Sequence, residues 1–262
     1  MSTATLAPSG HAGLLANTLT IMRRNLQHIR ADPEQLVGMT VQPLMFLVLF
    51  VYVFGGAIAG SSAEYLQFAL PGILVQGTAF TPFTTALGLN VDFQRGLIDR
   101  FRSLPIARSA VIGGRVAADG VRVLWGALIL IGFGVILGFR FAGGVDGALG
   151  AFLLVAAFGI TLCWPMAFIG VTAKSPEAVN TWGFMIILPL TFASSVFVPA
   201  ETMPGWLEAF VKVNPITAVV DATRGLMLGG PVAGPVVRSL IWLVAIQAVF
   251  APLAIARYRR RI

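Results

Sequence analysis

The chain has 262 residues, of which 57% are hydrophobic and only 11% are charged. Soluble domains carry about 25% charged residues. Here the apolar residues gather in runs of about 20, the length at which a helix crosses about 30 Å of hydrocarbon. The composition therefore excludes a soluble globular domain and predicts an all-α polytopic membrane protein. Its net charge of +7 is interpreted as a sign of membrane topology, because Lys and Arg are retained on the cytoplasmic side. It is not taken as a sign of nucleic-acid binding.

Residues 1–40 are predicted to form a cytoplasmic N-terminal segment that contains one amphipathic helix. Apolar residues recur there at helical spacing, with basic and polar residues among them: Leu15, Leu19, Met22, Leu26 and Ile29. A helix of this kind lies in the plane of the membrane interface. Its apolar face predicts an interfacial helix that precedes the first membrane span.

Six apolar runs predict six transmembrane helices within a membrane domain of residues 41–256. Their approximate limits are 41–60, 66–90, 116–138, 147–172, 179–199 and 236–256. With both termini cytoplasmic, four of the 18 basic residues fall outside, which leaves 18 − 4 = 14 inside. The outer four are Arg140, Lys212, Arg224 and Arg238. This asymmetry follows the positive-inside rule, and residues 257–262 then form a basic cytoplasmic tail.

The connector at about 92–105 concentrates charge between the second and third spans. Its arginines at 95, 100 and 102 take one side of a predicted helix. Apolar side chains take the other side: Leu97, Ile98, Phe101 and Leu104. Asp92 is the expected N-cap, and Pro105 ends the helix. Periodicity alone leaves two roles open, a helix that rests on lipid headgroups and a helix that docks another protein.

The segment 197–230, between the fifth and sixth spans, carries its own apolar stripe. Trp206, Leu207, Phe210 and Val211 recur at helical spacing, which a loop facing water does not require. The pattern predicts a pair of short re-entrant helices that dip into the outer leaflet, the alternative being an ordinary extracellular loop. Asp221 and Arg224 are three residues apart and are expected to form an ion pair.

No pattern in the sequence is typical of catalysis, cofactor binding or metal binding. The two histidines, His11 and His28, precede the first span, and the two lysines, Lys174 and Lys212, follow Ala and Val where a P-loop requires Gly. The sequence therefore assigns no catalytic, cofactor or metal residue. An ion-coupled secondary transporter remains the alternative function. It requires ionisable residues inside the spans, whereas Asp119 and Arg122 are expected to form a local pair at a membrane edge.

The amphipathic N-terminus and two further segments together resemble the type-2 ABC exporter permeases, in particular the daunorubicin-resistance-like drug and lipid exporters. One is "LIDRFRSLPIAR", in which a basic stretch precedes Leu-Pro between the second and third spans. The other is the run of residues 197–230, with the family's prolines, Trp, Asn-Pro and Arg at Pro199, Pro204, Trp206, Asn214, Pro215 and Arg224. The resemblance covers the whole chain, including the number of spans.

The resemblance implies the permease subunit of an exporter in a bacterial inner membrane, with a hydrophobic or amphipathic drug or lipid as cargo. Two ABC ATPase subunits would bind ATP and Mg²⁺, and a second permease, identical or a sister chain, would complete the complex. The connector would then be a coupling helix, docked on the ATPase through Arg95, Leu97, Ile98, Arg100, Phe101, Arg102 and Leu104. The extracellular gate would contain Pro199, Pro204, Trp206, Phe210, Asn214, Pro215 and Arg224.

Two further sets of residues are expected to serve the assembled exporter. Gly56 and Gly60 match the GxxxG spacing that allows helices to approach closely. In this family they would lie at the permease–permease interface. Gly134 and Gly138 share the spacing. The expected cargo path is lined by Phe50, Phe54, Phe184 and Phe192.

Overall fold

The computed structural model describes residues 33–95 and 108–261, and the regular elements in these ranges are all helices. The first half contains α2 (Pro33–Leu49), which continues through a π-helical turn (Phe50–Phe54) into α3 (Gly55–Ala59), then α4 (Ser62–Phe80), α5 (Phe83–Gln94) and α7 (Arg108–Ile136). The second half contains α8 (Gly144–Thr172), α9 (Pro176–Phe192), a 3₁₀ turn (Ala200–Thr202), α10 (Gly205–Val213), α11 (Pro215–Leu228) and α12 (Ala233–Arg261). The all-helical fold class is thereby confirmed for the described residues.

Four helical stretches in the described ranges are long and apolar enough to cross a membrane. They are Thr40–Ala59, Gly113–Ile136, Gly144–Thr172 and Ala233–Arg260. The expected second span, 66–90, is instead divided into α4 and α5, and the expected fifth span, 179–199, is helical only as far as Phe192. The structure thus supports a multi-pass membrane protein, while the number of six spans stays a prediction.

The break between α4 and α5 lies at Thr81 and Pro82. The ring of Pro82 replaces the backbone N–H that a continuous helix would use, and α5 restarts with hydrogen bonds from the backbone N–H groups of Thr85 and Ala86 to the Pro82 carbonyl at 3.0 and 3.2 Å. Pro71, by contrast, is accommodated inside α4. The expected second span is therefore two helices joined end to end.

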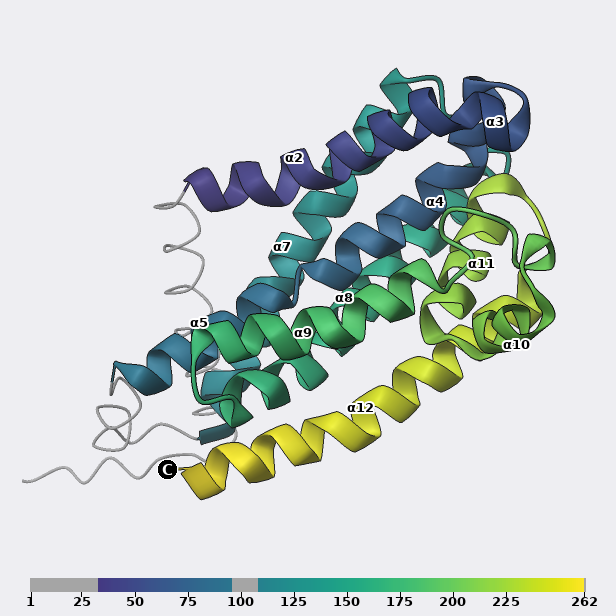
Figure 1. The fold of residues 1–262 in the computed structure, drawn as a ribbon. Coiled ribbons are helices and arrows are strands. Elements are labelled where there is room, and N and C mark those ends of the chain that lie inside the picture. Colours follow the sequence, from purple (N-terminus) through teal and green to yellow (C-terminus); the bar gives the residue numbers. More distant parts are fainter. Residues whose placement is uncertain (1–32, 96–107, 262) are drawn as a thin grey trace, which may run out of the picture.

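The helices run lengthwise beside one another, and their connections gather at two ends (Figure 1). The end of α5, the α8–α9 connection and the C-terminal end of α12 lie at one end, and α3, α10 and α11 lie at the other. We call the first the connector end and the second the α10–α11 end. Because α12 continues to Arg261, the expected tail at 257–262 begins as part of this helix.

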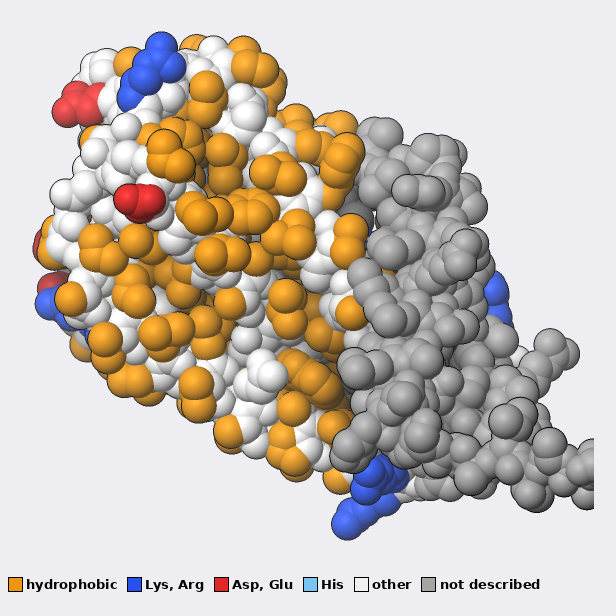
Figure 2. All heavy atoms as spheres, turned by 180° about the vertical axis from the view of Figure 1, so that it is seen from behind, with side chains coloured by type: hydrophobic (Ala, Val, Ile, Leu, Met, Phe, Trp, Pro, Cys, Tyr) orange, Lys and Arg blue, Asp and Glu red, His pale blue; other side chains and the backbone are white. Residues whose placement is uncertain are grey.

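Helix α8 forms the centre of the packing, because it contacts α5, α7, α11 and α12. Small residues allow the close approaches. A Cβ on Gly170 of α8 would collide with the carbonyl oxygen of Ala86 in α5. Away from this core, apolar side chains cover much of the outer surface, and charged side chains are sparse on the face shown in Figure 2. Such a surface fits hydrocarbon better than water.

Candidate functional site

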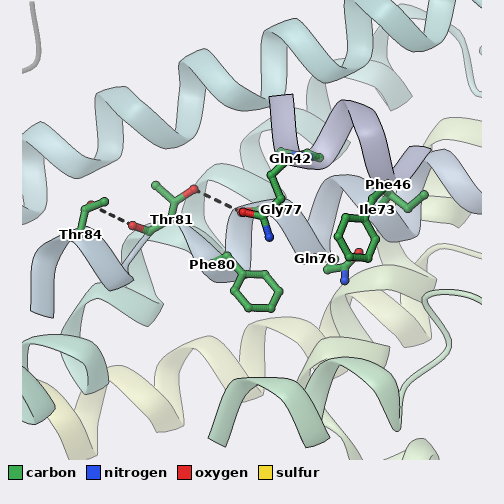
Figure 3. A pocket seen from close by; sticks show the side chains of 9 residues that line it. Gln42, Phe46, Ile73, Gln76, Gly77, Phe80, Thr81 and Thr84 are labelled. Carbon is green, nitrogen blue, oxygen red and sulfur yellow. Dashed lines mark hydrogen bonds between the residues drawn. The ribbon is translucent and has the colours of Figure 1, made fainter. Parts of the chain in front are cut away.

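A groove between α2 and α4 lies beside aromatic residues of the predicted cargo path. It has a volume of about 80 Å³, follows α4 from Ile73 to Phe80 and continues to Thr84 of α5 (Figure 3). Its lining is uncharged and mixes rings, carboxamides and hydroxyls: Gln42, Pro43, Phe46, Ile73, Gln76, Gly77, Phe80, Thr81 and Thr84. A Cβ on Gly77 would lie 3.2 Å from Pro43 Cγ, so glycine at this position allows α2 to approach α4.

Gln76 is the unusual member of the groove lining. Its side chain is only 5% exposed, yet its carboxamide makes no hydrogen bond to any described residue. Its polar atoms are not among the fully enclosed side-chain atoms without a hydrogen bond in the described residues, so the carboxamide can be reached from the groove. The two threonines nearby are bonded, since the Thr81 hydroxyl donates to the Gly77 carbonyl at 3.3 Å and the Thr84 hydroxyl donates to the Thr81 carbonyl at 2.9 Å. Gln76 is thus a polar residue of the groove lining whose carboxamide is available to form a hydrogen bond with a ligand.

The residues expected to line the cargo path separate into two aromatic clusters. At the α10–α11 end, the Phe50 ring lies 4.3 Å from the Phe197 ring, which also stacks on Phe192 at 5.4 Å. The Phe54 ring lies tilted against Phe50 at 5.2 Å. Phe184 belongs to a second cluster, 4.8 Å from Phe83. The structure therefore brings three of the four residues together.

The second cluster lies where α4 gives way to α5. Phe184 of α9 also lies 6.3 Å from Phe80, which is one of the groove residues. At the opposite side of the groove, Phe46 stacks on Phe50 at 5.9 Å. The groove therefore connects the two aromatic clusters, a relationship that sequence spacing did not reveal.

The segment expected to form the gate consists of α10, α11 and the turns that precede them. Asn214 organises the start of α11, because its Oδ1 accepts a hydrogen bond from the Ile216 N–H at 2.8 Å. Its Nδ2 donates to the carbonyls of Leu190 and Ala193, each at 2.7 Å. Pro215 follows as the first residue of α11, where a helix requires no N–H. One side chain thus joins α11 to the end of α9.

Arg224 forms the ion pair with Asp221 that the sequence predicts, at 3.6 Å. It also contacts partners that the sequence does not reveal. The guanidinium donates to the carbonyls of Phe68 at 3.1 Å and Ser195 at 3.0 Å, and it stacks over the Phe68 ring at 3.8 Å. The Ser195 hydroxyl donates to Asp221 at 2.8 Å. This network ties α11 to α4 and to the turn after α9.

The apolar stripe of α10 does not pack as one face. Val211 is fully buried, but Trp206 is 76% exposed and Phe210 is also exposed. Half-buried Glu208 and exposed Lys212 form an ion pair at 2.6 Å, and this hydrogen bond raises the pKa of Lys212. Trp206 and Phe210 thus face outward beside a charged pair, and the entry of this helix into the outer leaflet stays a prediction. Pro199 and Pro204 precede the 3₁₀ turn and α10 as their N-caps.

Most of the expected docking residues lie outside the described residues: Leu97, Ile98, Arg100, Phe101, Arg102 and Leu104. Arg95 is described and follows α5 as its exposed C-cap residue. The prediction that Asp92 is an N-cap is wrong, because Asp92 lies inside α5 and binds Arg115 of α7 at 2.7 Å. Three residues of the expected helix at 92–105 therefore belong to α5.

Helix α5 is held to its neighbours by buried polar groups. Asp119 of α7 is fully buried and binds Thr85 and Arg122, while the Arg122 guanidinium donates to the Thr84 hydroxyl at 3.1 Å. The expected Asp119–Arg122 pair is thus confirmed. On the other side, the Asn90 amide donates to two carbonyls of α8 and its C-cap residue, Gly170 at 3.1 Å and Ala173 at 2.8 Å. These bonds tie α5 to both α7 and α8.

Comparison with known proteins decides the family. The model of the ABC-2 type transporter family matches residues 16–228. The chain belongs to this family. It is 39% identical over 95% of its length to a daunorubicin resistance ABC transporter permease protein, DrrB1, of Streptomyces coeruleorubidus, covering 88% of that protein.

A second relative is a probable doxorubicin resistance ABC transporter permease protein, DrrC, of Mycobacterium tuberculosis. It is 29% identical over 94% of this chain and 89% of its own length. The family and these relatives identify the chain as an ABC exporter permease. The ion-coupled secondary transporter is thereby set aside as its function.

The glycines expected at the permease–permease interface differ in what they do. Gly56 lies on α3, where an added Cβ would meet no described atom within 4 Å. Gly60 follows α3 as its C-cap at a φ of +78°, a left-handed conformation that favours glycine. Gly60 therefore ends α3 and does not lie within it, and the permease–permease contact of the two glycines stays a prediction. Gly134 of α7 makes a close approach within the permease, since a Cβ there would collide with the Leu70 side chain.

Proposed function

We propose that this permease is the membrane subunit of an ATP-driven exporter that moves a hydrophobic or amphipathic drug or lipid out of the cytoplasm or the inner leaflet. The observation that carries the proposal is the 39% identity, over 95% of the chain, to a permease named for daunorubicin resistance. The uncharged groove and the two aromatic clusters that it connects support a cargo of this kind.

The complex would contain two ABC ATPase subunits, which bind ATP and Mg²⁺, and a second permease, identical or a sister chain. The segment after Arg95 would dock on an ATPase through its apolar side chains and arginines. The position of Arg95 at the connector end supports this arrangement, because the α8–α9 connection and the end of α12 lie there too (Figure 1).

The permease would cross a bacterial inner membrane six times, with both termini cytoplasmic and α4–α5 together forming the second span. Helices α10 and α11 would dip into the outer leaflet and form the extracellular gate. Their lengths of 9 and 14 residues support re-entrant helices, because a crossing requires about 20 residues. Trp206 and Phe210, which face outward on α10, would meet lipid or the second permease.

Inverted membrane vesicles that contain the permease and its ATPase partner test this function, with the neighbouring reading frame as the first candidate for that partner. Doxorubicin uptake is followed by its fluorescence, with and without ATP and with and without a proton uncoupler. We expect uptake that requires ATP and both subunits and that survives the uncoupler. An ATPase variant without its P-loop lysine is the control. Uptake by the permease alone, abolished by the uncoupler, would contradict the proposal.

A further inference from the structure

The α2–α4 groove combines a buried donor and acceptor with two aromatic rings. Gln76 is 5% exposed and unbonded within the described residues, and Phe46 and Phe80 belong to the same lining. A carboxamide carries both a carbonyl acceptor and an NH₂ donor. A ligand group that accepts or donates a neutral hydrogen bond would therefore satisfy Gln76, while an aromatic ring would find favourable contacts with the two phenylalanines.

We infer that this groove recognises the cargo, with the Gln76 carboxamide bonded to a neutral carbonyl or hydroxyl on an aromatic ring that contacts Phe46 and Phe80. The inference rests on the proposed export function and names the chemical class of the cargo. It also assigns a role to Gln76, a residue that belongs to no motif in the sequence.

The charge of the lining favours an aromatic cargo over a phospholipid headgroup. None of the groove residues is Lys, Arg, His, Asp or Glu. Phosphate groups are typically held by charge-assisted hydrogen bonds from Arg or Lys, which this lining does not offer. A neutral carbonyl or hydroxyl requires only one neutral hydrogen bond, which Gln76 can supply.

The size of the groove limits which part of the cargo it holds. Its volume is about 80 Å³, whereas pockets that enclose a whole drug-sized molecule measure about 300–1,000 Å³. The groove therefore holds one ring edge of the cargo, and the rest of the cargo lies outside the groove. Recognition of a single ring edge suits a permease that must release its cargo as well as bind it.

Equilibrium binding to the purified permease separates this hydrogen bond from general apolar contact. Two probes are used: doxorubicin, whose rings carry carbonyls and hydroxyls, and tetraphenylphosphonium, which has no hydrogen-bonding group. In Gln76→Leu we expect the Kd for doxorubicin to rise about three- to tenfold, the effect of one neutral hydrogen bond. The Kd for tetraphenylphosphonium should stay unchanged. Phe46→Ala should weaken both probes, because it removes a ring contact.

Gln247→Leu is the matched control, because Gln247 is exposed on α12, outside the groove. We expect it to bind both probes as the unmodified permease does. An unchanged Kd for doxorubicin in Gln76→Leu would overturn the inference, as would an equal loss of both probes or no binding of doxorubicin to the unmodified permease.

ATP-driven uptake into vesicles then distinguishes the site from the function. A raised KM for doxorubicin in Gln76→Leu, with normal ATPase recovery, supports both. Binding that depends on Gln76 without any ATP-driven uptake by the unmodified permease leaves the site in place and overturns the export function. Normal uptake by Gln76→Leu at an unchanged KM leaves export in place and overturns the site.

Discussion

The guanidinium of Arg224 lies 3.8 Å from the centre of the Phe68 ring, and it also donates a hydrogen bond to the carbonyl of the same residue at 3.1 Å. The two residues are 156 positions apart in the chain. One side chain of α11 therefore holds both the ring and the backbone of a residue in α4. Any movement of α11 away from α4 has to break both contacts together.

Arg224→Lys should destabilise the permease while keeping its charge. A lysine ammonium lacks the planar fork that reaches two carbonyls and a ring together, so we expect a loss of about 1.5–3 kcal/mol. Thermal unfolding in detergent measures this loss, and vesicle uptake should fall with it. Arg238→Lys, at an exposed position on α12, is the control and should match the unmodified permease. Equal melting temperatures for both variants would show that this network adds no stability.

Trp206→Ala should reduce export, whereas Val211→Ala should reduce stability. Val211 is fully buried, so its truncation should lower stability, by about 1–2 kcal/mol on the scale of small core deletions. Trp206 is 76% exposed, so its truncation should leave stability unchanged but reduce export, through loss of contact with lipid or a second permease. Thermal unfolding and vesicle uptake at equal expression measure the two effects. Normal export by Trp206→Ala would make α10 an inert surface helix.

Phe101→Ala should uncouple the ATPase more strongly than Arg95→Ala. Apolar anchors at interfaces commonly contribute at least 2 kcal/mol, which corresponds to about thirtyfold in affinity. Exposed arginines contribute less and are screened by salt. Co-purification of the ATPase at low and high salt measures both variants. Full recovery of the ATPase with Phe101→Ala, and salt-sensitive loss with Arg95→Ala alone, would favour a helix that rests on lipid headgroups.

Single-cysteine labelling should place the two ends of the molecule on opposite sides of the membrane. Cys163 is buried in α8, so Cys163→Ala provides the background. A cysteine at position 208 should react with an impermeant reagent in intact cells, and one at position 100 should react only after the cells are opened. The reverse pattern would invert the topology and place the connector outside.

Local pairs were predictable from the sequence, and long-range partners were not. Asp119–Arg122 and Asp221–Arg224 are three residues apart on single helices, so helical geometry alone brings each pair together. Arg224 also bonds Phe68, whose position depends on how α11 packs against α4. No spacing in the sequence encodes that packing.

The positions of proline and glycine show the same limit. Pro71 lies inside α4, whereas Pro82 ends up between two helices. The sequence gives both the same local effect, and tertiary packing decides which of them interrupts the helix. Gly60 matched a contact motif, but its positive φ shows that it serves a turn. Gln76 carried no signal in the sequence, because its significance depends on burial without a partner.

The break at Thr81 and Pro82 makes the groove a shared property of two helices. Phe80 belongs to α4 and Thr84 to α5, and α5 leads directly to Arg95. With the groove as the proposed cargo site, an ATPase state that shifts α5 relative to α4 is expected to change the shape of its lining and its affinity for cargo. Because binding free energies are reciprocal, bound cargo must then alter the affinity of the permease for that ATPase state by the same factor. Cargo bound in the groove would thus change how tightly the permease binds its ATPase on the nucleotide-binding side, without a separate signalling element.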